Sequence, residues 1–408
     1  MNHNTSLLLP SRSGFARGGL ALPSFDEHDH ELVDLSSLGF EFPLEGSARG
    51  TNTFGDVLTQ TVDGRDLNEI WREFSATLLL NNRRRNVLID LLSFNVSAPI
   101  EDVPQLATSD FEEASEFGVP KGIRGGDYFS LGYDFKWYDL AVRYTWMYLA
   151  EASAAQVESL HNMALEADNR LIFTKIMKAM FSNINRTATI RGTAVNVYPF
   201  YNNDGTTPPD YNMNTFTNTH NHYLSSGAAT VTFGDLDEME THLVEHGYGR
   251  QQGSRLLLLV NRVELATIRG FRVASGATYD FVPAAGQAPF LLPTNTGGVV
   301  GQVPTSVGGL PVAGAYGNWI VIESDFIPAA YMLGFATGGE QQASNPVGFR
   351  QHANAGLRGM RQVKGPDPDY PLIDSYYQRG FGTGVRHRGA AAIMKISAGA
   401  YTIPAIYA

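Results

Sequence analysis

The sequence contains no cysteine among its 408 residues. A chain without cysteine forms no disulfides and offers neither thiolate metal ligands nor a cysteine nucleophile. It also lacks an apolar run of about 18 residues, which a membrane-spanning helix needs, and its N-terminal apolar run is too short for a signal peptide. We therefore expect a protein that is made in the cytoplasm and has no membrane partner.

Charge is scarce and mostly negative. Charged residues make up 17% of the chain, against a typical value of about 25%, and the formal net charge is -11. Proteins that hold nucleic acid through its phosphates need a basic surface, so this class is disfavoured. The negative charge remains compatible with a container that encloses nucleic acid without binding its phosphates. The hydrophobic content of 43% supports a large core.

Catalytic signatures are missing as well. The sequence has no P-loop and no G-x-S-x-G motif. The glycine-rich run GFGTG at residues 380–384 lacks the preceding strand and following helix of a dinucleotide-binding unit, so we predict a tight turn there. Because no nucleophile–base arrangement is evident, we assign no catalytic, cofactor-binding or metal-binding residues and expect a protein that is not an enzyme.

A long amphipathic helix is predicted at residues 153–181. Apolar residues recur at helical spacing along it, and neither glycine nor proline interrupts it. Ser153 and Gln156 form a capping-box pattern at its start. Such a helix would be about 43 Å long, which is uncommon in globular domains. Asp168 falls on its polar face, and the apolar stripe is expected to pack on a sheet of the same chain.

An extended aromatic stretch precedes this helix, at residues 127–149. Large apolar side chains alternate along it, which is typical of β-strands. We predict one or two long strands with a register change near residues 138–140, followed directly by the long helix.

The other expected elements are short. A helix is predicted at residues 66–94, with an end or a break near the arginine run at 83–85. Further helices are predicted at 234–246 and 263–270, and strands at 187–190, 194–198, 255–261, 318–326, 331–335, 390–396 and 400–406. The glycine- and proline-rich residues 282–318 read as a long loop or hairpin.

Several histidines could be read as metal ligands. The H-x-x-E-H spacing at residues 242–246 is that of inverted zinc peptidases, but it lacks a third ligand and a general base, and it lies at a helix end closed by Gly247. We read it mainly as a polar helix end. His220 and His222 are expected to be exposed loop residues, and the acidic-histidine run at 26–30 is expected to be a solvated loop.

The order of several stretches resembles one known family. The run YDLAVRYTWMYLAEASAAQVESLHNMALEADNRLIFTKIMKAMF is similar to the part of tailed-bacteriophage major capsid proteins in which the extended loop re-enters the body and becomes the spine helix. The stretches HNHYLSSGAATVTFGDLDEMETHLVEHGYG, GSRLLLLVNRVE and GFGTGVRHRGAAAIMKI resemble capsid proteins of phages that infect actinobacteria. Together these pieces cover about residues 65 to 400.

The resemblance implies an α+β fold of the Hong-Kong-97 type. Its parts would be an N-terminal arm at 1–66, a helical segment at 67–94, an extended loop (E-loop) at 95–148, a peripheral domain at 149–224 with the spine helix at 153–181, an axial domain at 225–345, and a return to the peripheral domain with C-terminal strands at 346–408. The short arm lacks the helical scaffold segment of some members, so a separate scaffolding protein, or none, is expected. Some members cross-link a loop lysine; Lys121 and Lys136 lie in the loop, but no partner asparagine can be matched.

The implied function is that of a major capsid protein. Its many copies would form pentamers and hexamers that close into an icosahedral head around double-stranded DNA, with possible scaffolding and decoration proteins and a portal protein as partners. The protein would be located in the virion after assembly in the host cytoplasm. Two alternatives remain at this stage, namely an encapsulin-like nanocompartment and a zinc-dependent hydrolase using residues 242–246.

Aromatic residues of the extended stretch are the candidate intersubunit contacts, because large aromatics dominate interface energetics. They are Tyr128, Phe129, Tyr133, Phe135, Trp137 and Tyr138. About half of them would belong to the core of their own chain if the stretch packs on its own body.

Overall fold

The computed structural model describes most of the chain from residue 60 onward. The described residues are 60–83, 86–104, 113–114, 116, 118–119, 128–190, 192–249, 253–284, 303–364 and 372–408. Most of the predicted N-terminal arm, the run at 26–30 and Lys121 lie outside them. No helix among the described residues is long and apolar enough to cross a membrane.

The described part of the chain contains both α-helices and β-strands. The α-helices are α1 (Leu67–Arg83), α2 (Val87–Leu92), α3 (Trp146–Glu151), α4 (Ala154–Phe181), α5 (Phe233–Glu245) and α6 (Arg262–Ile268). The strands up to the middle of the chain are β1 (Ser93–Val96), β2 (Ile100–Pro104), β3 (Tyr128–Gly132), β4 (Lys136–Thr145), β5 (Arg186–Ile190), β6 (Thr193–Val197), β7 (Tyr223–Ser225) and β8 (Arg255–Val260). The later ones are β9 (Val282–Pro283), β10 (Ser306–Val307), β11 (Leu310–Pro311), β12 (Gly314–Tyr316), β13 (Trp319–Glu323), β14 (Tyr331–Thr337), β15 (Val347–Gln351), β16 (Met360–Lys364), β17 (Leu372–Val385) and β18 (Ala391–Lys395). This mixed content is the predicted α+β class.

A seven-stranded sheet carries one part of the core, in the order β7-β18-β14-β8-β13-β12-β9. Its strand β8 is buried on both faces, as expected for an uninterrupted apolar run. Leu257 and Leu259 pack into one core cluster with α2 and α4, whereas Leu256, Leu258 and Val260 pack into a second cluster with α5 and α6. Layers of helices therefore cover both faces of this sheet.

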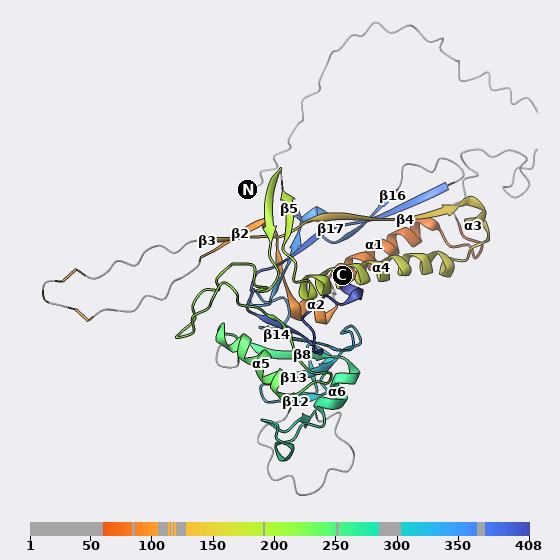
Figure 1. Cartoon of the computed structure of the whole chain (residues 1–408). Helices are drawn as coiled ribbons and strands as arrows, with labels where there is room; N and C mark the ends of the chain where they lie inside the picture. The colour runs from red at the N-terminus through yellow and green to blue at the C-terminus, as the bar shows by residue number, and fades with distance from the viewer. Residues whose placement is uncertain are drawn as a thin grey trace, which may run out of the picture. The chain divides into compact units, whose positions relative to one another are not determined.

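A second sheet is organised around β17, which at 14 residues is the longest strand among the described residues. Strand β4 pairs antiparallel with β17 from Leu372 opposite Thr145 to Phe381 opposite Lys136. On its other edge β17 pairs first with β16 and then with β15, and β15 pairs with β1. In Figure 1, β4, β16 and β17 form a long ribbon above α1 and α4.

Helix α4 confirms the long helix predicted from the sequence. It spans 28 residues, and the Ser153 backbone N–H donates a 2.9 Å hydrogen bond to the Gln156 side chain, which closes the start of the helix. The first half of α4 packs with α1 and β4, and its second half packs into the large cluster shared with both sheets. Its apolar side thus faces the sheets of its own chain.

Other boundaries differ from the predicted ones. The helix expected at 66–94 is two helices followed by β1, and Asn86 caps the second by accepting a 3.0 Å hydrogen bond from the Leu88 N–H. The strand break in the aromatic stretch falls at residues 133–135, earlier than predicted, and α3 separates β4 from α4. The strand expected at 400–406 is wrong, because residues 400–404 are irregular and a 3₁₀ turn follows at Ala405–Tyr407.

Candidate functional site

The six candidate contact residues lie on β3, on β4 and on the connection between them. Tyr128 and Trp137 are the most exposed, at 72% and 45%. Three others are partly buried by ring contacts within the chain: Phe129 against Tyr198, Phe135 against Trp137, and Tyr138 against Phe381. Two large aromatic side chains of this stretch are therefore directly available to another molecule.

Tyr133 is a core residue of its own chain. Its hydroxyl donates a 2.8 Å hydrogen bond to Glu101, and burial together with this bond raises the pKa of Tyr133. Its ring occupies the space beside Gly348 and Gly384, where an added Cβ would lie 2.2 and 2.7 Å from ring atoms. A partner could reach Tyr133 only by opening the subunit.

The tight turn predicted at residues 380–384 is wrong, because this run belongs to β17. Its alternating glycines make room for the chain that connects β3 to β4. A Cβ on Gly382 would lie 1.7 Å from the backbone oxygen of Asp134, and one on Gly380 would lie 2.6 Å from the ring of Trp137. Glycine in a strand interior permits such close approach, so these residues set where the extended stretch leaves the body.

The polar-face position predicted for Asp168 is also wrong, since its carboxylate is buried between α4 and β17. Arg379 donates to it through Nε and, at 2.6 Å, through Nη2, and the two side chains are only 8% and 5% exposed. Burial raises the pKa of Asp168, and the charge of Arg379 opposes this rise. The pair fixes α4 against β17.

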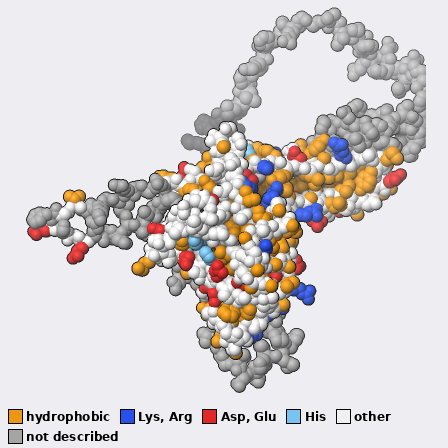
Figure 2. All heavy atoms as spheres, in the orientation of Figure 1, with side chains coloured by type: hydrophobic (Ala, Val, Ile, Leu, Met, Phe, Trp, Pro, Cys, Tyr) orange, Lys and Arg blue, Asp and Glu red, His pale blue; other side chains and the backbone are white. Residues whose placement is uncertain are grey.

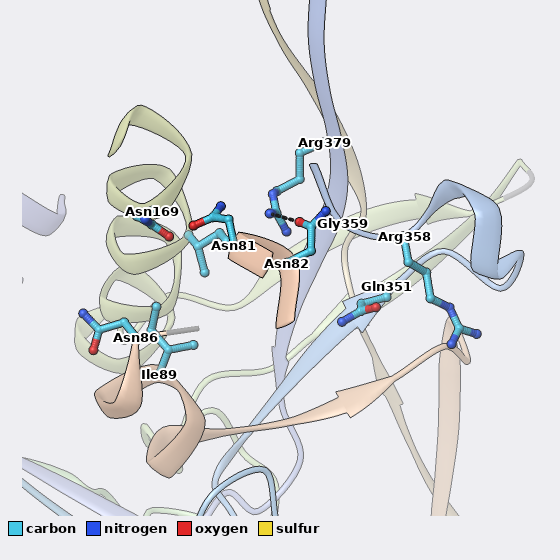
Figure 3. Close-up of a pocket in the computed structure, with 10 residues that line it drawn as sticks. Asn81, Asn82, Asn86, Ile89, Asn169, Gln351, Arg358, Gly359 and Arg379 are labelled. Carbon is cyan, nitrogen blue, oxygen red and sulfur yellow. Dashed lines mark hydrogen bonds between the residues drawn. The ribbon is translucent and has the colours of Figure 1, made fainter. Parts of the chain in front are cut away.

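A small cavity lies next to this pair. Figure 3 shows Arg379 hydrogen-bonded to Asn82 near the end of α1, with Asn81, Asn169 and Gln351 nearby. Its volume of about 110 Å³ is well below the 300 Å³ or so of a small-molecule site. We therefore assign no ligand to it.

His161 lies on the same face of α4 as Asp168, two helical turns earlier, and is also buried. Its ring stacks on Phe74 with centroids 4.0 Å apart, and Nδ1 lies 2.9 Å from the Tyr377 hydroxyl. Its Nε2 has no hydrogen-bond partner. Burial lowers the pKa of His161 to about 4, so the folded chain holds this ring neutral.

Acid is expected to destabilise the subunit through His161. Because its pKa is lower in the folded than in the unfolded chain, its contribution is complete above the unfolded value of 6.5 and is lost as the pH falls towards about 4. Between about pH 7 and pH 5 the loss in free energy of unfolding is about 2 kcal/mol. Urea denaturation of unassembled subunits at pH 7 and pH 5 measures this difference in free energy of unfolding. In His161→Gln the difference should be smaller than in the wild type by about 2 kcal/mol. His352→Gln, which changes a loop histidine, should keep the wild-type loss; equal losses in all three proteins would contradict the assignment.

Arg388 joins the loop after β6 to the segment before β18. Its guanidinium donates to Asp204 at 2.7 Å and to the backbone oxygen of Pro199 at 2.8 Å, and it lies 4.5 Å from the Tyr201 ring centroid. Burial alone would raise the pKa of Asp204, but hydrogen bonds from Thr206 and the charge of Arg388 lower it overall. The charged pair is almost completely buried.

Three histidines meet beside this loop. Nε2 of His220 lies 3.0 Å from Nε2 of His222 and 2.9 Å from Nε2 of His246. The expectation that His222 is exposed is wrong, because it is fully buried, and His220 is half-buried. Of the H-x-x-E-H pattern only His246 takes part, together with two histidines from the loop before β7, and we call His220, His222 and His246 the histidine cluster.

The arm formed by α1, α3, α4 and β4 exposes further apolar side chains. Figure 2 shows hydrophobic atoms gathered along it. Those at least 40% exposed are Leu79, Leu80, Trp137, Leu140, Met147 and Met163. Contiguous exposed apolar surface usually marks an interaction site.

The chain is similar to a solved chain of Mycobacterium phage Patience. The two are 44% identical with a TM-score of 0.70, and the match covers 89% of this chain and 98% of that one. No protein-family model and no curated protein matches the chain.

The chain is also similar, more distantly, to two other solved structures. The mature capsid of bacteriophage PhiM1 is 10% identical with a TM-score of 0.47, over 77% of this chain and 88% of that one. The SrpI encapsulin complex of Synechococcus elongatus is 14% identical with a TM-score of 0.42, over 80% and 97%.

Proposed function

Because this chain belongs to the Hong-Kong-97-type major capsid proteins of tailed bacteriophages, we propose that its copies form both pentamers and hexamers that close into an icosahedral head around double-stranded DNA. It is a structural protein of the phage capsid and of the virion, it self-assembles into shells, and it is not an enzyme. The observation that carries the proposal is the 44% identity over 89% of the chain. The zinc-hydrolase and encapsulin alternatives are set aside on the same ground.

The parts of the chain take the roles that this family implies. Residues 67–94 are the helical segment, and residues 95–148 act as the E-loop. Residues 149–224 and 346–408 form the peripheral domain around α4. Residues 225–345 form the axial domain around the seven-stranded sheet, to which β7 and β18 are added from outside that range.

Contacts between copies involve the exposed aromatic stretch and the strand that follows it. Tyr128 presents most of its ring to solvent. Among the described residues β4 pairs with β17 alone, so its second edge has free backbone groups that another chain can cover. The apolar arm surface continues from this edge, and many modest contacts of this kind add up when a shell closes.

The charge of the protein suits enclosure rather than binding of DNA. A formal net charge of -11 repels phosphates, so packaged DNA stays free to move inside the head. The shell assembles in the host cytoplasm. Its partners there are a portal protein and, where the phage encodes them, scaffolding or decoration proteins.

Replacing Tyr128 by serine is expected to impair shell assembly without unfolding the subunit. The side chain is 72% exposed, so its removal takes little from the core, whereas loss of an aromatic hot spot weakens each contact by about 2 kcal/mol. Electron microscopy of the protein expressed with its phage partners should show shells for the wild type and few for Tyr128→Ser, while the thermal transition of the unassembled subunit stays in place.

Met213→Ser is the matched control, because Met213 is 97% exposed and lies in the loop after β6. It should assemble like the wild type. A wild-type protein that never makes rings or shells would contradict the proposed function. Normal shells from Tyr128→Ser would contradict only the contact assigned to this residue.

A further inference from the structure

The histidine cluster joins two separate segments of the subunit. His220 and His222 lie just before β7, at the end of the long loop that follows β6, and His246 is the C-cap residue of α5. One ring nitrogen of each of the three residues lies within 4.8 Å of those of the other two. Side chains from distant parts of the sequence therefore aim their nitrogen atoms at one point.

Hydrogen bonding alone does not account for this arrangement. Nδ1 of His222 lies 2.7 Å from the backbone oxygen of Ala391, which can only accept, so Nδ1 carries the hydrogen and Nε2 presents a lone pair. Nε2 of His220 then contacts two nitrogens at once, those of His222 and His246. A single hydrogen on it points at only one of them, so one of the two close nitrogen pairs always lacks a bonding proton.

A metal ion at the centre would satisfy all three nitrogens together. In a tetrahedral site with metal–nitrogen bonds of about 2.0–2.1 Å, ligand nitrogens lie about 3.3 Å apart. Two of the three separations, 2.9 and 3.0 Å, reach that spacing when the rings move by a few tenths of an ångström, and the third lies within 4.8 Å. Burial also keeps His220, His222 and His246 neutral by lowering their pKa values, which leaves lone pairs for a cation.

The surroundings hold the rings as a metal site requires. The backbone carbonyl of Ala391 fixes the tautomer of His222. A backbone carbonyl is a usual hydrogen-bond partner for the second ring nitrogen of a metal-ligating histidine. The ring of His246 is stacked between Phe216 and Tyr201, with centroids 4.2 and 5.4 Å away.

A fourth imidazole lies next to the cluster. The ring centroid of His242 is 5.3 Å from that of His220 and 5.4 Å from that of His222. Its Nδ1 is buried and has no hydrogen-bond partner. Burial lowers the pKa of His242 as well, so this ring is a neutral candidate for the remaining coordination position, which otherwise takes water.

We propose that His220, His222 and His246 bind one divalent transition-metal ion per chain, with His242 or water as the fourth ligand. Three imidazoles suit zinc, and also nickel or copper, whereas magnesium and calcium prefer oxygen ligands. The ion fastens the loop between β6 and β7 to the end of α5 and to β18. Its role is structural, because it locks a loop onto the sheet of a subunit that is not an enzyme.

The test uses the full-length protein and zinc as the probe. Protein stripped with a chelator is incubated with zinc sulfate, desalted and analysed by mass spectrometry for metal. Wild type and the control His352→Gln should retain about one zinc per chain, and His220→Gln and His246→Gln should retain roughly a tenth of that or less. Zinc should raise the thermal transition of the wild type by several degrees and leave that of His246→Gln unchanged.

Cobalt supplies a readout that does not depend on the variants folding well. Cobalt(II) bound by three or four imidazoles in a tetrahedral site gives an intense visible absorption band, which zinc should abolish by displacement. Equal zinc retention by wild type and both variants, or a wild type in which zinc changes neither the thermal transition nor the cobalt band, would overturn the site. Either result leaves the capsid function untouched.

Discussion

Replacing Arg379 by methionine is expected to lower the free energy of unfolding of the subunit by about 3–5 kcal/mol. The guanidinium of Arg379 is the only cation bonded to Asp168 among the described residues, and both side chains are almost fully buried. Without it, α4 carries an unpaired carboxylate inside the protein, and Asn82 loses a 3.0 Å hydrogen bond as well. Chemical denaturation of unassembled subunits measures the loss.

The double variant Asp168→Leu with Arg379→Met separates the charge effect from packing. A buried ion pair replaced by apolar side chains of similar volume is often neutral or stabilising, so the double variant should recover most of the stability lost in Arg379→Met. Glu73→Gln removes one partner of the exposed Arg65–Glu73 pair and should change stability by less than about 1 kcal/mol. A double variant as unstable as the single one would show that lost packing, not the bare carboxylate, causes the effect.

Arg388→Met is expected to destabilise the subunit by a similar amount, about 3–5 kcal/mol. It leaves the buried carboxylate of Asp204 without its cation and the oxygen of Pro199 without its donor. The aromatic contact with Tyr201 is weakened too, because methionine carries no charge. Since the loop after β6 then loses its main anchor, proteolysis within residues 198–222 should accelerate.

Arg358→Met provides the matched control for Arg388→Met. Arg358 is exposed and, within the part of the chain that the structure describes, donates only to the backbone oxygens of His352 and Ala353. Its replacement should cost less than about 1 kcal/mol and leave cleavage of the 198–222 loop unchanged. If Arg358→Met and Arg388→Met behave alike in denaturation and proteolysis, the anchoring role assigned to Arg388 is wrong.

Local sequence signals predicted the elements that depend on local interactions. The capping pattern at Ser153 and the uninterrupted apolar periodicity located α4 to within one residue. The apolar run of β8 and the amphipathic pattern of α5 were equally informative, because each buries side chains at the period of its own backbone. The capsid family came from the order of such stretches rather than from any single motif.

Distant partners explain what could not be predicted. From sequence alone, a carboxylate in an amphipathic helix is predicted to face solvent. The residues next to Asp168 in the sequence do not indicate its partner, an arginine 211 residues away. The glycines of β17 read as a turn because the chain that they accommodate lies elsewhere in the sequence. His220 and His246 are 26 residues apart, so the cluster is visible only after the loop and α5 are placed in space.

The pairing of β17 with β4 has a consequence for synthesis on the ribosome. Strand β4 and helix α4 emerge long before β17, whose contacts with them close loops of more than 200 residues, and such non-local pairings form late. A nascent chain therefore lacks the sheet beneath its exposed stretch until nearly all of it has been translated. We therefore expect incomplete chains to be unable to enter a growing lattice, where a truncated subunit would leave a defect.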